Sequence, residues 1–122
     1  MILMLNLSSI MIGSMQKVAL ADFYEKIFQR KPDMSEEGFS GWLVGKTFFS
    51  VGEHSEMKGI TKDPGRIMFN FETNEVKEEF ERIKEIGAKV VKEPYEMGGI
   101  WIGTLADPDG NYFQLMTPWK AE

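Results

Sequence analysis

The side chains that most often carry chemistry in proteins are scarce in this sequence. It contains no cysteine and a single histidine, His54. The absence of cysteine excludes disulfides, thiolate zinc sites and a cysteine nucleophile. A serine nucleophile needs a base such as histidine, and His54 lies in Gly52–Glu56, which we expect to be a solvated loop. The sequence therefore predicts no catalytic triad and no metal ligand at His54.

Three further patterns could carry chemistry, and each has a simpler interpretation. Gly41–Thr47 is similar to a phosphate-binding loop, but three residues separate its glycines instead of four, and a strand-like run follows it. Glu93 and Glu96 flank an expected bend at Pro94–Tyr95, where one of them could act as a general base. The remaining acidic run has the spacing of a solvated helix face: Glu75, Glu78, Glu79, Glu81 and Glu85.

The composition is that of one soluble globular domain. The 122 residues are 43% hydrophobic and 27% charged, and the net charge is −5. This charge argues against nucleic-acid binding, which needs a clustered basic surface. No basic residue precedes Lys17, so a secretory signal is not expected, and no apolar run is long enough to span a bilayer. We therefore expect a cytoplasmic protein with no membrane or nucleic-acid partner, in which the apolar start Met1–Leu5 is part of a strand.

The sequence contains two copies of one pattern. Phe80 lies 57 positions after Phe23, and Gly41–Gly45 returns as Gly99–Gly103 at an offset of 58. Each copy reads as a strand, an amphipathic helix and further short strands. The predicted first strands are Leu5–Ile12 and Arg66–Glu72.

Each predicted helix has start and stop signals. Ser14 is the expected N-cap of the first helix, and Lys31–Pro32 is expected to end it. Thr73 or Asn74 is expected to cap the second, and Gly87 to terminate it.

The end of the chain carries the most specific motif. Asp107–Asn111 is an acidic turn with proline and glycine at positions that favour it. A strand follows, in which Gln114 is the polar residue among apolar ones. This arrangement resembles the C-terminal signature of the vicinal oxygen chelate superfamily, which includes glyoxalase I, extradiol dioxygenases and bleomycin-binding proteins. The helix pattern Ala21–Phe28 is also similar to that superfamily.

The resemblance covers nearly the whole chain and implies an α+β fold. It implies two βαβββ modules, about 1–57 and about 63–122, which form one cup-shaped mixed sheet within a single domain of residues 1–122. Relatives often pair modules across a subunit boundary, so the resemblance also implies a homodimer.

In the superfamily's metalloenzymes, four ligands project from the first and last strands of the modules. The matching positions here are Ser9, Ser50, Arg66 and Gln114, with the middle two defined to within a residue or two. Hydroxyls and an amide bring no negative charge, and a cation would repel a metal ion. We therefore expect no metal and no other cofactor.

Strand alternation extends these positions into a predicted ligand-binding surface. Met68 and Asn70 share a face with Arg66, and Trp42 and Trp101 occupy equivalent places in the repeats, where they could form stacking walls. The predicted set is Ser9, Met11, Trp42, Phe48, Ser50, Arg66, Met68, Asn70, Trp101, Tyr112, Gln114 and Met116. The same side chains could instead fill the core, with Arg66 in an ion pair and the tryptophans in ordinary sheet packing.

Three functions fit this surface. The sequence favours a metal-independent protein that binds a planar or amphipathic small molecule without converting it. A metal-dependent lyase or dioxygenase of the glyoxalase type, with ligands aligned differently, is the alternative. A degenerate paralogue that acts only as an interaction module is the third.

Overall fold

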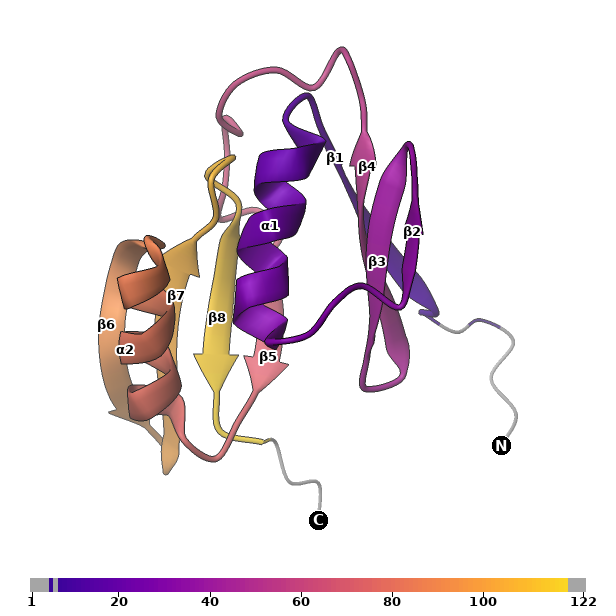
Figure 1. Cartoon of the computed structure of the whole chain (residues 1–122). Coiled ribbons are helices and arrows are strands. Elements are labelled where there is room, and N and C mark those ends of the chain that lie inside the picture. The colour runs from indigo at the N-terminus through magenta and orange to yellow at the C-terminus, as the bar shows by residue number, and fades with distance from the viewer. Residues whose placement is uncertain (1–4, 6, 119–122) are drawn as a thin grey trace. The chain divides into compact units, whose positions relative to one another are not determined.

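The computed structural model describes residue 5 and residues 7–118. It divides the chain into two compact units, Met1–Gly59 and Ile60–Glu122. Each unit contains one βαβββ module, as the sequence predicts (Figure 1). The elements of the first unit are β1 (Ser9–Ser14), α1 (Lys17–Phe28), β2 (Met34–Glu36), β3 (Phe39–Val44) and β4 (Thr47–Glu53). Those of the second are β5 (Phe69–Glu72), α2 (Val76–Ile86), β6 (Lys89–Met97), β7 (Ile100–Ala106) and β8 (Tyr112–Met116).

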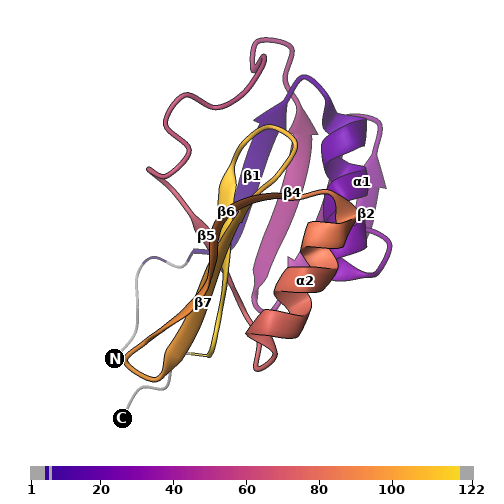
Figure 2. The same cartoon turned by 90° about the vertical axis from the view of Figure 1, so that its left-hand side faces the viewer.

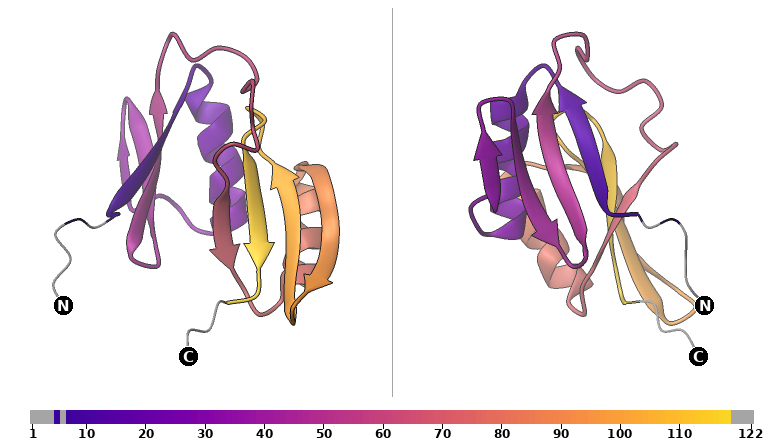
Figure 3. Two further views of the ribbon diagram at one scale, coloured as in Figure 1. Left: turned by 180° about the vertical axis from the view of Figure 1, so that it is seen from behind. Right: turned by 90° about the vertical axis from the view of Figure 1, so that its right-hand side faces the viewer.

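The first unit is a four-stranded mixed sheet, sheet A, with α1 on one face. The strand order is β1-β4-β3-β2, with β1 parallel to β4 and the other pairs antiparallel. The apolar face of α1 is buried through Leu20, Phe23, Tyr24 and Ile27. Phe49 packs against the Tyr24 ring at a centroid distance of 4.8 Å, so odd-numbered residues of β4 face the helix. The opposite face of sheet A is turned toward the viewer in the right panel of Figure 3.

The second unit, with sheet B, repeats this topology. Its order is β5-β8-β7-β6, again with a parallel first pair. Val76, Phe80 and Ile83 of α2 are buried, as their spacing predicts, and Gly87 ends the helix with a φ of 118°. Figure 2 shows the β6–β7 hairpin. It turns at Gly98 and Gly99, both with positive φ. No helix among the described residues is long and apolar enough to cross a membrane.

The predicted strand starts and helix caps are wrong in detail. β1 begins at Ser9 instead of Leu5, and Met1–Met4 lie outside the described residues. Ser14 is the buried last residue of β1, and its Oγ accepts a hydrogen bond from the backbone N–H of Gln16 at 3.0 Å. Thr73 Oγ1 likewise accepts from the N–H of Glu75. Both hydroxyls therefore shape the turn that precedes a helix, while the N-cap residue follows two positions later.

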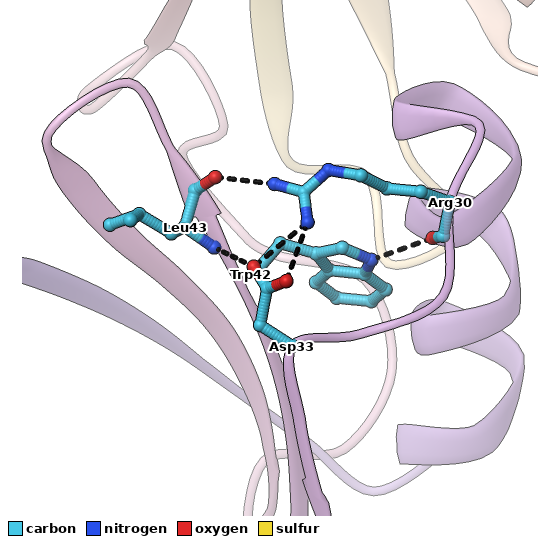
Figure 4. A network of polar contacts seen from close by, with 4 residues as sticks. All are labelled: Arg30, Asp33, Trp42 and Leu43. Carbon is cyan, nitrogen blue, oxygen red and sulfur yellow. Dashed lines mark hydrogen bonds and ion pairs between the residues drawn. The ribbon is translucent and has the colours of Figure 1, made fainter.

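A polar network fixes the connection from α1 to β3 (Figure 4). The Arg30 guanidinium donates to both carboxylate oxygens of Asp33 at 2.8 Å and to the carbonyl oxygen of Leu43. Asp33 also accepts a hydrogen bond from the Leu43 N–H at 2.6 Å. The Arg30 hydrogen bonds, followed by the Leu43 N–H, lower the pKa of Asp33 from its ordinary value of 3.8. The loop is thereby fastened to β3 by an ionised carboxylate.

Candidate functional site

The face of sheet B opposite α2 carries a row of neutral polar side chains. Gln114 on β8 pairs in register with Asn70 on β5 and with Thr104 on β7. The Gln114 amide Nε2 donates a hydrogen bond to Thr104 Oγ1 at 3.0 Å. Tyr112 and Met116 lie on either side of Gln114 on the same face of β8. The left panel of Figure 3 shows this face of the sheet, with α2 behind it. This row offers hydrogen-bond donors and acceptors, and the less polar side chains Tyr112 and Met116 lie on either side of it.

Thr104 is absent from the residues predicted from the sequence. It is 5% exposed, and strand alternation puts it on the same face of β7 as Ile102 and Ala106. The signal was present, since Thr104 is the polar side chain in an otherwise apolar strand, as Gln114 is in β8. Only the β7–β8 register shows that the two polar positions meet.

Four predicted residues share the face of sheet A opposite α1. Ser9 is in register with Phe48, and Met11 with Ser50, so all four lie on one side of β1 and β4. Ser50 is buried, and its hydroxyl donates to the carbonyl oxygen of Ile10 at 3.5 Å, whereas Met11 is 69% exposed. The predicted alternation of side chains between the two faces of β1 and β4 is therefore correct. The face opposite α1 combines the apolar side chains Met11 and Phe48 with the hydroxyls of Ser9 and Ser50.

The two tryptophans do not line these faces. Trp42 is 0% exposed, packs edge-on against Phe28, and donates from Nε1 to the carbonyl oxygen of Arg30 at 2.9 Å. Trp101 lies beneath Lys77 of α2, whose Nζ is 3.8 Å from the ring centroid. Both strands turn their tryptophan toward their own helix. The prediction of stacking walls is wrong, and the alternative of ordinary sheet packing holds for both.

Arg66 is also not where the sequence places it. β5 begins at Phe69, so Arg66 and Met68 precede the strand, and Ile67 between them is 71% exposed. The Arg66 side chain is 77% exposed and lies 3.9 Å from the Asp63 carboxylate. An exposed ion pair at that distance contributes little to the stability of the fold. Arg66 is therefore a loop residue with a local ion pair.

The predicted ligand positions of each unit carry donors that do not fit a catalytic divalent metal. In the first unit Ser9 and Ser50 provide hydroxyl oxygens, and in the second Gln114 provides an amide oxygen, all without charge. Glu72 lies on the same face of β5 as Asn70 and adds a single carboxylate, whereas catalytic zinc sites use three imidazole, thiolate or carboxylate ligands. Among the described residues, no three His, Cys, Asp or Glu side chains are grouped so as to hold a metal ion. His54 follows the last residue of β4 in a loop, as predicted, and its Nδ1 accepts from the Glu56 N–H.

The acidic turn Asp107–Asn111, the closing turn of the chain, positions β8 and hence Gln114. Asp107 is 5% exposed, and its Oδ1 accepts from the backbone N–H groups of Asp109 and Asn111 at 2.9 Å each. The Asn111 amide donates to both carboxylate oxygens, and Gly110 has a φ of 84°. The predicted turn is therefore present, with Asp107 at its centre.

Comparison with known proteins agrees with this topology. A family model described as a glyoxalase-like domain matches residues 9–116. The chain belongs to this family. It is thus a member of the vicinal oxygen chelate superfamily, as the closing motif indicates.

Solved structures with the same fold cover nearly all of this glyoxalase-like domain. A glyoxalase-related enzyme from Fulvimarina pelagi is 19% identical, with a TM-score of 0.77, covering 93% of this chain and 88% of its own. A glyoxalase/bleomycin resistance protein/dioxygenase family enzyme from Burkholderia phytofirmans PsJN is 24% identical, with a TM-score of 0.76, covering 93% and 98%. TioX from Micromonospora sp. ML1 is 15% identical, with a TM-score of 0.68, covering 92% and 98%. No curated protein matches the chain significantly. At these identities the structural matches establish the fold alone.

Proposed function

We propose that this glyoxalase-like domain is a metal-independent binding protein for a planar or amphipathic small molecule. The observation that carries the proposal is the hydrogen bond from Gln114 to Thr104 on the face of sheet B opposite α2. Gln114 carries a neutral amide at a position that, by the resemblance to the superfamily, matches a metal-binding glutamate of its metalloenzymes. The amide can bind a polar group of a ligand, but it brings no charge to a metal ion.

The surroundings of Gln114 support ligand binding. Asn70 adds a second amide, and Tyr112 and Met116 flank the polar row. Convergent polar groups beside apolar side chains are typical of small-molecule sites. Methionine adapts its shape to different partners, which suits a protein that sequesters its ligand.

The experiment is a thermal-shift screen in metal-free buffer, after dialysis against a chelator. Aromatic acids, nucleotides and glycopeptide antibiotics are the compounds to test. We expect at least one of them to raise the unfolding temperature, and Gln114→Ala to reduce that rise. Asn74→Ala is the matched control, because Asn74 is an exposed amide in the loop between β5 and α2.

The alternative is a metal-dependent lyase or dioxygenase, and elemental analysis distinguishes it. About one equivalent of zinc, nickel, iron or manganese per chain, lost in Gln114→Ala, would establish the alternative and reject the proposal.

We also infer a cytoplasmic homodimer. Several large apolar side chains of sheet A are exposed, among them Met11, Met34 and Leu43, and a second subunit would cover such a surface. The apolar run Met1–Leu5 also favours a dimer as a feature of the sequence; of these residues the structure describes Leu5, which is exposed.

A further inference from the structure

The second unit contains a pocket at the closing-turn end of sheet B. Its volume is about 410 Å³, within the range of small-molecule sites. Its walls come from the segment before β5, the first residues of β6 and the closing turn, and they include Ile60, Pro64, Lys89, Val91, Ala106 and Tyr112. The pocket lies beyond the Gln114 row and shares only Tyr112 with the predicted binding surface.

The floor of the pocket is one rung of sheet B. Lys89 on β6, Ala106 on β7 and Tyr112 on β8 are in register, so all three lie on the face opposite α2. The small Ala106 between two long side chains leaves room above the sheet.

The roof is the segment that precedes β5, and it is fastened to the closing turn. The Thr61 N–H donates to the carbonyl oxygen of Asp109 at 3.0 Å. Ile60 lies close to Gly110, where an added Cβ would come within 2.5 Å of its Cγ2. This glycine therefore permits both the turn and the close approach of the roof.

The polar groups of the pocket differ in whether they are already engaged in hydrogen bonds. The Asp107 carboxylate is committed to the turn. Lys89 Nζ and the Tyr112 hydroxyl form no hydrogen bond or ion pair with any residue that the structure describes. The pocket thus offers one cation and one hydroxyl beside apolar walls.

We infer that this pocket binds a small aromatic carboxylic acid. The carboxylate is held by Lys89 and the Tyr112 hydroxyl, and the aromatic ring lies against Ile60, Val91 and Ala106. Burial of the ring supplies most of the affinity, and the cation selects the charged form of the ligand. The inference goes beyond the proposed function, because it concerns a different part of sheet B and does not depend on Gln114.

Calorimetric titration with indoleacetate and with its uncharged amide, indoleacetamide, tests the inference. We expect saturable binding of indoleacetate with a Kd of about 1 mM or lower, which suits a ligand of this size. Lys89→Met should weaken it about three- to fivefold, the effect of losing one partly exposed charge, while Lys89→Arg retains binding. Neither change should alter the weaker binding of indoleacetamide.

Controls localise the effect. Lys92→Met removes another lysine of β6 that does not line the pocket, and we expect it to leave the Kd unchanged. Val91→Trp places a large ring in the pocket from an exposed position and should abolish binding. Amide NMR shifts should change at Lys89, Val91 and Ala106. Absence of saturable binding, or binding that Val91→Trp leaves intact, overturns the inference. Gln114→Ala is expected to preserve indoleacetate binding, so this result is independent of the proposed function.

Discussion

The ring of Phe48 lies directly over Gly41 of the neighbouring strand. An added Cβ at Gly41 would come within 2.3 Å of Phe48 Cζ. Phe48 and Gly41 both lie on the face of sheet A opposite α1. Because Gly41 has no side chain, the Phe48 ring can pack against its backbone.

Gly41→Ala should therefore destabilise the protein. The added methyl group must displace a half-buried ring, and overpacking of this kind costs about 1–3 kcal/mol. Chemical denaturation measures the change. Gly38→Ala is the control, because no atom lies within 4 Å of an added Cβ there. Adding Phe48→Ala to Gly41→Ala should recover part of the loss; an equal loss in the double variant would contradict the steric explanation.

Asp33→Asn should lower the unfolding temperature at neutral pH. The folded-state pKa of Asp33 is depressed, so the stability it provides is present above its ordinary value of 3.8 and is lost as the pH falls through the folded-state pKa. The variant should therefore lose less stability than the wild type on acidification below about pH 4. Thermal unfolding as a function of pH gives both results. Asp22→Asn, at an exposed position of α1, is the control and should leave the unfolding temperature at neutral pH unchanged.

Asp107→Ala should be among the most destabilising substitutions at a polar position. It removes the acceptor of the Asp109 and Asn111 N–H groups in a buried turn, at about 1–3 kcal/mol for donors left unsatisfied. Pro108→Ala, at the exposed neighbouring position, should cost less than about 1 kcal/mol. Denaturation midpoints compare the two variants, and similar values would refute the role of the carboxylate.

Gln114→Glu should not create a tight metal site. The change adds one charge, but the register neighbours of position 114 on sheet B, Asn70 and Thr104, supply only an amide and a hydroxyl. Titration with zinc or manganese, followed by calorimetry, should show no stoichiometric binding in the wild type or in the variant. Tight binding by Gln114→Glu alone would mean that the remaining ligands are other residues.

The protein should form a dimer in solution. Two chains of 14.0 kDa give about 28 kDa together. Light scattering at micromolar concentration measures this mass directly, and a value near that of one chain would exclude the dimer.

Local patterns predicted the features that depend on neighbouring residues. The closing turn follows from Asp107, Pro108 and Gly110, because each fixes its own backbone or that of its neighbours. The faces of β4 and β8 follow from simple alternation, which placed Ser50 and Gln114 correctly away from the helices. The buried face of α2 follows from its period.

The sequence by itself determined the module, βαβββ, its repetition and the neutral side chain at position 114. Tertiary structure decided which groups meet. Alternation separates the two faces of a strand but does not say which one the helix covers, and the pairing of Trp42 with Phe49 resolved this for β3. Because β5 begins at Phe69, Arg66 lies outside the strand, and the β7–β8 register puts Thr104 beside Gln114. Such contacts depend on pairings between distant segments, which local sequence patterns do not specify.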